Sequence, residues 1–322
     1  MRAGYPGGLA AWAGFTLPSA IALTLFAFAE GALKGPAGEG LVHGLKLVAV
    51  AIVAQAVLGM AQSLAPDRPR ATIAVLALLL MAFAPGAGAQ IAVILLGALA
   101  GIVVCREGGG AEAAVAKAPI SRPMGIVFAA GFFILLAVSF LPAREGTAAL
   151  ASAFYRSGAL VFGGGHVVLP LLHAAVVDPG WVSANAFLAG YGAAQAMPGP
   201  LFTFAAYLGA VAGVGPGGVA GAALALVAIF APGLLILMAA LVFWRDLRTL
   251  SRARAAMAGV NAAVVGLLAS ALYNPVWTSA VRTPADFAIA AAGFVALTVW
   301  RAPPLLVVVA TAAAAAVLSL AG

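Results

Sequence analysis

Nine long apolar segments constrain this chain more than any other feature, because few folds can accommodate them all. They cover residues 8–29, 41–63, 71–84, 89–105, 124–142, 217–243, 256–273, 285–300 and 303–320. An apolar helix of about 20 residues crosses the roughly 30 Å hydrocarbon core of a bilayer. Since 65% of the residues are hydrophobic and 8% are charged, a soluble fold cannot shield this surface. The pattern predicts an all-α polytopic membrane protein with about 9–11 transmembrane helices.

The region between residues 148 and 215 departs from this pattern. Its apolar segments are short and are interrupted by glycine and proline. The strongest interruptions are the Gly-Gly-Gly-His run of residues 163–166 and the Gln-Ala-Met-Pro-Gly-Pro run of residues 195–200. Broken backbone at membrane depth is tolerated only where protein or a polar cavity satisfies its N–H and C=O groups. Such breaks are typical of half-helices or re-entrant hairpins that line a transport path.

The chain shows weak internal similarity. Residues 3–105 align with about 213–320, starting from a shared Pro-Gly-Gly motif. Each copy continues through a polar loop into a span that holds Gly44 or Gly259. Segment 150–212, with both breaks, has no counterpart upstream.

Three units are predicted from this alignment. Residues 1–105 form an incomplete first repeat, 106–123 a polar cytoplasmic linker and 124–322 a complete second repeat. The second unit of the pair is therefore expected to carry the working site.

The basic residues lie mainly in short loops, so the net charge of +7 indicates topology rather than a nucleic-acid partner. Loop 244–256 is rich in arginine, which favours the cytoplasmic side. With the loop near Arg68 and the linker also cytoplasmic, loop 30–40 is external. The two copies then have opposite orientations, as in an inverted repeat. A parallel duplication with a noisy charge bias is the alternative.

The Pro-Gly-Pro break offers a helix end for an anion. Pro198 disfavours helical geometry before it, Gly199 permits an unusual backbone, and Pro200 fits the first position of a new helix. The N–H groups of residues 201–203 would then be free at the positive end of that helix. Such helix ends bind anions.

The glycine break can add a second helix end to the same site. Gly163, Gly164 and Gly165 carry no Cβ, so a ligand can approach closely, and a short helix can begin near Val167. His166 is the candidate switch. Protonated, it would strengthen anion binding, and neutral, it would favour release, which would couple transport to protons.

Other polar residues complete the predicted binding site. Gln195, Tyr191, Thr203 and Tyr207 are neutral donors, and Arg156 is the closest fixed cation, placed to guard the cavity mouth. Simpler interpretations stay open. The glycines can serve close helix packing, and the histidine can be a packed neutral residue. The Pro-Gly-Pro run can be a plain loop, and the arginine can be a side chain that snorkels to the membrane surface.

An enzyme is not expected, and neither catalytic residues nor a cofactor or metal site are predicted. The chain has no Gly-x-Ser-x-Gly turn and no Walker A motif, its three histidines are scattered, and Cys105 is its single cysteine. A passive anion channel is harder to exclude, since the same anion site could serve a pore. Uphill accumulation of substrate distinguishes a transporter from a channel.

Two stretches resemble a known family. The runs Phe154–Leu172 and Phe187–Phe204, which contain the two breaks, are similar to the second-half motifs of the chromate ion transporter family. The resemblance extends through loop 244–256 and the final spans. It also includes Arg2–Ala20, which is similar to a stretch midway through the family's first half, so that nearly the whole chain is covered.

The resemblance implies a secondary active transporter of the inner membrane that exports chromate, with sulfate as a related oxyanion. The expected coupling ion is the proton, and a homodimer is kept open. Long-chain members have two homologous halves, each with both motifs, whereas this chain carries the second set alone. We therefore expect a start codon assigned too late, or else a defective or partner-dependent protein with a truncated first half.

Overall fold

The computed structural model describes residues 4–30, 35–105, 121–141 and 145–321. It does not describe the side chains of residues 4–6, 30, 244–249 and 321. Within these ranges the chain forms helices and turns, and no strand is present. The predicted linker 106–123 lies outside the described residues as far as residue 120. The all-α prediction is confirmed.

All nine predicted apolar segments form helices. They are α1 (Gly4–Glu30), α2 (Pro36–Leu64), α3 (Arg68–Phe83), α4 (Ala87–Val104), α5 (Arg122–Ser139), α10 (Gly218–Thr249), α11 (Ser251–Ala271), α13 (Pro284–Thr298) and α14 (Pro304–Ala321). In the described ranges, six spans are long and apolar enough to cross a membrane. They come from α1, α2, α4, α5, α10 and the segment Ser251–Ala280, in which α11 is followed by η4 (Leu272–Trp277) and α12 (Thr278–Ala280). The chain is a polytopic membrane protein.

The predicted loop at residues 244–256 is wrong. α10 continues to Thr249 and α11 begins at Ser251, so only Leu250 separates the two helices. Arginine and alanine are good helix formers, so a basic stretch of this composition does not need to leave the helix.

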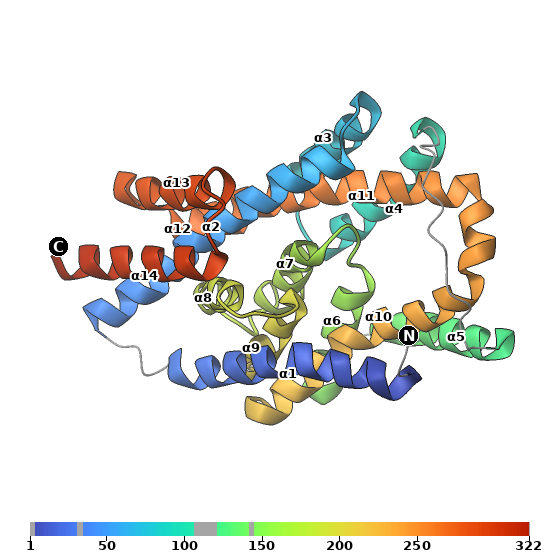
Figure 1. Cartoon of the computed structure of the whole chain (residues 1–322), viewed down its shortest axis with the longest axis horizontal. Helices are drawn as coiled ribbons and strands as arrows, with labels where there is room; N and C mark the ends of the chain where they lie inside the picture. The colour runs from blue at the N-terminus through green and yellow to red at the C-terminus, as the bar shows by residue number, and fades with distance from the viewer. Residues whose placement is uncertain (1–3, 31–34, 106–120, 142–144, 322) are drawn as a thin grey trace.

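Short helices replace full spans between residues 146 and 211, as predicted. They are α6 (Gly146–Ala159), η1 (Gly165–Val167), α7 (Val168–Leu172), η2 (His173–Val177), α8 (Ala184–Gln195), η3 (Leu201–Thr203) and α9 (Phe204–Val211). Figure 1 shows α7, α8 and α9 in the middle of the molecule, with α1 on one side of them and α2 and α11 on the other.

Four aromatic residues form the centre of this short-helix region. Phe187, Tyr191, Phe204 and Tyr207 are fully buried. Phe204 contacts each of the other three, with ring centroids 5.2, 5.8 and 6.0 Å apart. Since they lie on α8 and α9, this aromatic cluster holds the helices before and after the Pro-Gly-Pro break together.

A helix of each predicted repeat packs against helices of the other repeat. α2 packs along α14 and α13, whereas its predicted counterpart α11 packs along α4 and α3. Glycines allow the close approach: a Cβ at Gly44 would lie 2.5 Å from the Cα of Ala312, and one at Gly259 would lie 2.5 Å from the Cα of Gly101. Gly44 and Gly259 occupy equivalent spans in the sequence alignment. This reciprocal packing agrees with a repeat, which stays a prediction.

Candidate functional site

The two broken segments lie next to each other. The glycine break leads into η1, the Pro-Gly-Pro break leads into η3, and these two turns are in contact. A Cβ at Gly165 would lie 3.6 Å from the Cβ of Leu201, an ordinary van der Waals distance. Together, residues 163–166 and 195–203 form what we call the break site. Two segments that are distant in the sequence therefore meet, as the sequence analysis predicts.

The glycine break is an open stretch of unusual backbone. Gly163 and Gly164 have φ angles of 80° and 152°, which L residues rarely adopt. The three glycines are exposed, and no described atom lies within 4 Å of a Cβ placed at Gly164. The chain then turns into η1 and α7, whose first turn accommodates Pro170. The free space beside Gly164 leaves room for a ligand, whereas a Cβ at Gly163 would lie 3.1 Å from the Cδ1 of Leu64.

The Pro-Gly-Pro break is closed by α1. Gly199 is not among the residues with positive φ, so the predicted unusual backbone at this position is wrong. A Cβ at Gly199 would instead collide with the Oγ of Ser19 and lie 3.2 Å from the carbonyl oxygen of Phe15. Ser19 Oγ donates to the carbonyl of Pro198 at 2.6 Å. The glycine is therefore required because a neighbouring helix comes so close.

The helix after Pro200 begins as a 3₁₀ turn. The backbone N–H and the hydroxyl of Thr203 both donate to the carbonyl of Pro200, each at 2.9 Å. The predicted free N–H at Thr203 is therefore wrong, because a 3₁₀ turn closes its hydrogen bond one residue earlier than an α-helix. The N–H groups of Leu201 and Phe202 are the two helix-end donors that come before this bond.

His166 is half-buried and paired with a tyrosine. Its Nδ1 lies 2.9 Å from the hydroxyl of Tyr191, which is fully buried on α8. A neutral imidazole can accept this hydrogen bond at Nδ1, and a protonated one can donate it to the phenolic oxygen. The contact can therefore persist in both protonation states while it holds the ring in place.

Two buried polar atoms at or beside the breaks have no hydrogen-bond partner among the described residues. They are Gln195 Nε2 and Asn261 Oδ1. Asn261 Oδ1 would lie 3.6 Å from a Cβ at Gly163. A buried polar group without a partner costs about 1–3 kcal/mol. These atoms therefore point to a polar ligand or ordered water at the break site.

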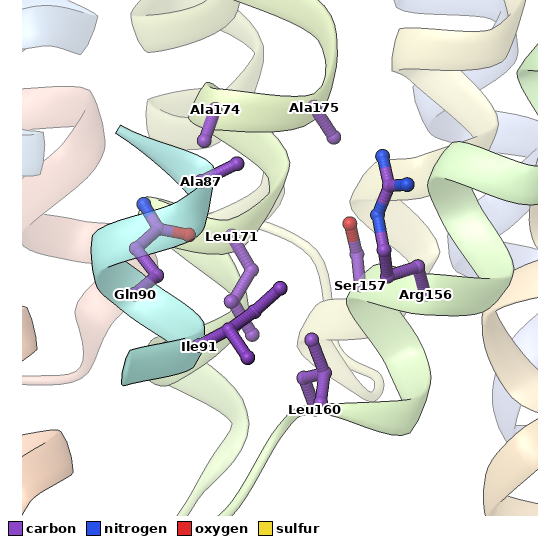
Figure 2. A pocket seen from close by; sticks show the side chains of 9 residues that line it. All are labelled: Ala87, Gln90, Ile91, Arg156, Ser157, Leu160, Leu171, Ala174 and Ala175. Carbon is purple, nitrogen blue, oxygen red and sulfur yellow. The ribbon is translucent and has the colours of Figure 1, made fainter. Parts of the chain in front are cut away.

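Arg156 lies elsewhere. Its Nη1 donates to the carbonyl of Ser139 at 3.0 Å, and its guanidinium lies 5.4 Å from the ring centroid of Phe140. With Gln90 and Ser157 it lines a small cavity of about 30 Å³ (Figure 2), and no residue of the break site belongs to that lining. The structure does not bring Arg156 to the predicted site, because its guanidinium turns toward the end of α5.

The other predicted donors divide into two groups. Tyr191 bonds to His166 and Gln195 begins the Pro-Gly-Pro break. The hydroxyl of Tyr207 instead donates to the carbonyl of Ala186 at 3.0 Å and links α9 to α8. Thr203 likewise serves the turn after Pro200. Two of the four neutral donors therefore have structural roles.

Residues outside the breaks were missed by the sequence reasoning. Ser19 on α1 and Asn261 on α11 both come close to a break. Each is a polar residue inside an apolar span, a class that marks functional positions in membrane proteins. That signal was present in the sequence, but it did not say which break each residue would meet.

Comparisons with known proteins all point to one family. The sequence model of a family described as Chromate transporter matches residues 1–102 and 148–317. A chromate transport protein from Pseudomonas aeruginosa is 32% identical over 152 residues, or 45% of this chain and 35% of that protein. A probable chromate transport protein from Synechococcus elongatus is 29% identical over 124 residues, or 38% of this chain and 30% of that protein. The matched part thus spans about a third of each relative. No solved structure matches the chain.

Proposed function

Because the chain belongs to the chromate transporter family, we propose that it carries chromate, or a related oxyanion such as sulfate, across the inner membrane. The observation that carries this proposal is the meeting of two broken helical segments beside buried polar atoms that have no partner in the described part of the chain. Broken helices that meet in this way form the substrate sites of many secondary transporters. Export from the cytoplasm and coupling to a proton gradient are part of the proposal.

The break site supplies donors for an oxyanion. The N–H groups of Leu201 and Phe202 lie at the positive end of the η3–α9 helix, and Gln195 Nε2 is a buried donor without a partner among the described residues. His166 completes this set of donors from the opposite break. The exposed glycines beside it give the anion a path of approach.

His166 is the proposed coupling residue. Its hydrogen bond to Tyr191 holds the ring at the break site in either protonation state. A bound proton adds a positive charge next to the anion and strengthens its binding, and loss of the proton favours release. The direction of coupling follows from which side of the membrane each state faces.

Two inverted halves are the proposed architecture, with residues 1–105 and 124–322 as the units. The reciprocal packing of α2 with α13 and α14, and of α11 with α3 and α4, supports this arrangement. In such proteins one half rocks against the other around a fixed site, which alternates access between the two sides of the membrane.

Chromate uptake into everted membrane vesicles, with and without an imposed proton gradient, tests the proposal. We expect gradient-driven accumulation that is lost, or no longer depends on pH, in His166→Ala. His173→Ala is the matched control, because His173 lies outside the break site and contacts Asp178 at 3.2 Å. Uptake that only equilibrates would indicate a passive channel. No uptake from well-inserted protein would indicate an inactive or partner-dependent chain.

A further inference from the structure

A second polar cavity lies at the opposite end of α2 from the glycine break. It has a volume of about 700 Å³ and is formed by α2, α8, α13, α14 and the turn before α13. Its charged residues are Glu39 and Lys46 on α2, Arg282 in the turn and Asp286 on α13, and the titratable His43 lies between the first two. α8 and α14 contribute only neutral residues to the lining. We call it the polar cavity.

The fixed charges of this lining cancel. Lys46 and Arg282 carry two positive charges, and Glu39 and Asp286 carry two negative charges. A neutral His43 therefore leaves the lining without net charge, and a proton on His43 makes it positive. In a chain with 8% charged residues, a histidine and charged side chains at the end of an apolar span mark a functional position. The protonation state of one histidine thus sets the net charge of the cavity.

Asp286 holds the ring of His43 so that one nitrogen is left to titrate. Its Oδ1 lies 2.7 Å from Nε2 of His43, and its Oδ2 accepts from the backbone N–H groups of Arg282 and Thr283 at 3.0 and 2.9 Å. Three hydrogen bonds favour the charged carboxylate, which can only accept, so Nε2 carries the hydrogen of this pair. Nδ1 is therefore left to bind a proton, and the His43 side chain is 24% exposed in the cavity wall.

We propose that the His43–Asp286 pair is a proton-binding site of this protein, separate from His166 and the break site. A proton from water in the cavity bonds to Nδ1 of His43, while the hydrogen bond from Nε2 to Asp286 stays intact. The imidazolium then lies beside the carboxylate, and such a charge-assisted hydrogen bond is about twice as strong as a neutral one. The proton therefore tightens the tie between α2 and α13.

The other charges of the cavity keep both states of His43 accessible. The exposed Glu39 lies one helical turn before His43 on α2 and favours the imidazolium. Lys46, one turn after His43, and Arg282 favour the neutral ring. Lys46 is 6% exposed, and its Nζ also donates to Asn185 Oδ1 at 2.9 Å. A histidine whose neighbours oppose one another can bind and release a proton as the pH changes.

α2 connects this site to the glycine break. Near the far end of the helix, Met60 Cε and Leu64 Cδ1 would lie 3.5 and 3.1 Å from a Cβ at Gly163. His43 and Leu64 are about 30 Å apart along the helix axis. A proton on His43 favours the arrangement in which α2 is held against α13, and the far end of α2 brings that preference to the break.

The position of the cavity suits a proton that enters from the outer side of the membrane. Loop 30–40 precedes this end of α2, and the charge distribution predicts that the loop is external. The proton then enters from outside while the anion leaves from the cytoplasm. This coupling role rests on the proposed function, whereas proton binding by the pair does not depend on it.

NMR of the purified full chain in nanodiscs, with ¹⁵N-labelled histidine, tests proton binding. The chain has three histidines, and the His43 signals are those absent from His43→Gln. If that variant does not fold, spectra of His166→Ala and His173→Gln assign the same signals by elimination.

We expect the Nδ1 signal of His43 to change between about pH 5 and 8, while the Nε2 signal stays that of a nitrogen that carries hydrogen. In Asp286→Asn the same change should need a lower pH, because the carboxylate that stabilises the imidazolium is gone. His43 signals that do not respond to pH, or that respond identically in Asp286→Asn, would overturn the site.

Chromate uptake into everted vesicles tests the coupling role. The lumen of these vesicles corresponds to the outer side, so an acidic lumen should speed uptake by the wild-type chain. His43→Gln keeps an amide N–H for Asp286 but binds no proton, and it should lose most of this acceleration. His173→Gln is the matched control, because His173 also pairs with a carboxylate, that of Asp178, and lies outside the cavity lining.

The outcomes separate this proposal from the proposed function. Full acceleration by an acidic lumen in both His43→Gln and His173→Gln would overturn the coupling role. A wild-type chain in which His43 titrates as expected, but which takes up no chromate, would count against the proposed function alone.

Discussion

The two breaks both depend on glycine, but for different physical reasons. At Gly163 and Gly164 the backbone itself requires it, since both have positive φ, and the space beside Gly164 is open. At Gly199 the backbone is ordinary, and the requirement comes from Ser19 and Phe15 on α1. One break is an exposed surface and the other is a packed joint. A helix-breaking sequence alone therefore does not tell which of the two a break will be.

This difference assigns separate roles to the two sides of the break site. The packed joint anchors the start of the η3–α9 helix, because α1 holds the Pro198 carbonyl through Ser19. The glycine side is free of such contacts at Gly164. We therefore expect stability to depend mainly on the Pro-Gly-Pro side and ligand access mainly on the glycine side.

Gly199→Ala should have the largest effect. The added Cβ collides with Ser19 Oγ, and overpacking of this kind costs about 1–3 kcal/mol. A lower midpoint of thermal unfolding in detergent, with loss of chromate transport, is the expected result. Gly233→Ala is the control, because no described atom lies within 4 Å of a Cβ there. Equal stability of the two variants would contradict the packed joint.

A double variant sharpens this prediction. Ser19→Gly removes the hydroxyl that the new Cβ would strike, although it also removes the hydrogen bond to Pro198. Combined with Gly199→Ala it should recover part of the lost stability, as a coupling energy between contacting residues. If the two substitutions changed the free energy of unfolding in a strictly additive way, the strain in Gly199→Ala would not come from the contact with Ser19.

Gly164→Ala should have an intermediate effect. The new side chain meets open space, but its φ of 152° is unfavourable for any residue other than glycine. Such backbone strain costs on the order of 1–3 kcal/mol, and an exposed segment can relax part of it. The unfolding midpoint should fall by less than in Gly199→Ala. A drop larger than that would show that the glycine break is also a packed element.

Gly165→Ala should have the smallest effect on stability. Its φ is not positive, and the new Cβ would make an ordinary contact with Leu201. We expect a change within about 0.5 kcal/mol. Chromate binding, measured by equilibrium dialysis, should nevertheless weaken if the bare backbone lets the anion approach. Unchanged binding would limit the role of this glycine to helix packing.

Much of the fold could be predicted because it depends on local composition. Apolar segments of sufficient length form helices, and the Gly-rich and Pro-rich region forms short ones, since both follow from backbone preferences and hydropathy. The prediction of a loop at residues 244–256 was wrong because charge alone does not end a helix, and the basic stretch there is helical apart from Leu250.

The site could be predicted only in part. The meeting of the two breaks followed from their chemistry, and Gln195 and His166 lie there as expected. The approach of Ser19 and Asn261 from distant helices depends on tertiary packing, which no local pattern encodes. Arg156 was misplaced because its neighbourhood in the sequence does not reveal that its side chain turns toward Ser139.

The dissociation constant of chromate for Gln195→Glu, compared with the wild-type chain, tests the central claim most directly. The two side chains have the same shape, but glutamate replaces a buried donor with a negative charge at the proposed anion site. Gln55→Glu is the control, because Gln55 lies on α2 and donates to the carbonyl of Leu297 at 3.3 Å. We predict that Gln195→Glu weakens chromate binding about a hundredfold while Gln55→Glu has little effect. Equal affinity of Gln195→Glu and the wild type would contradict an oxyanion site between the two breaks.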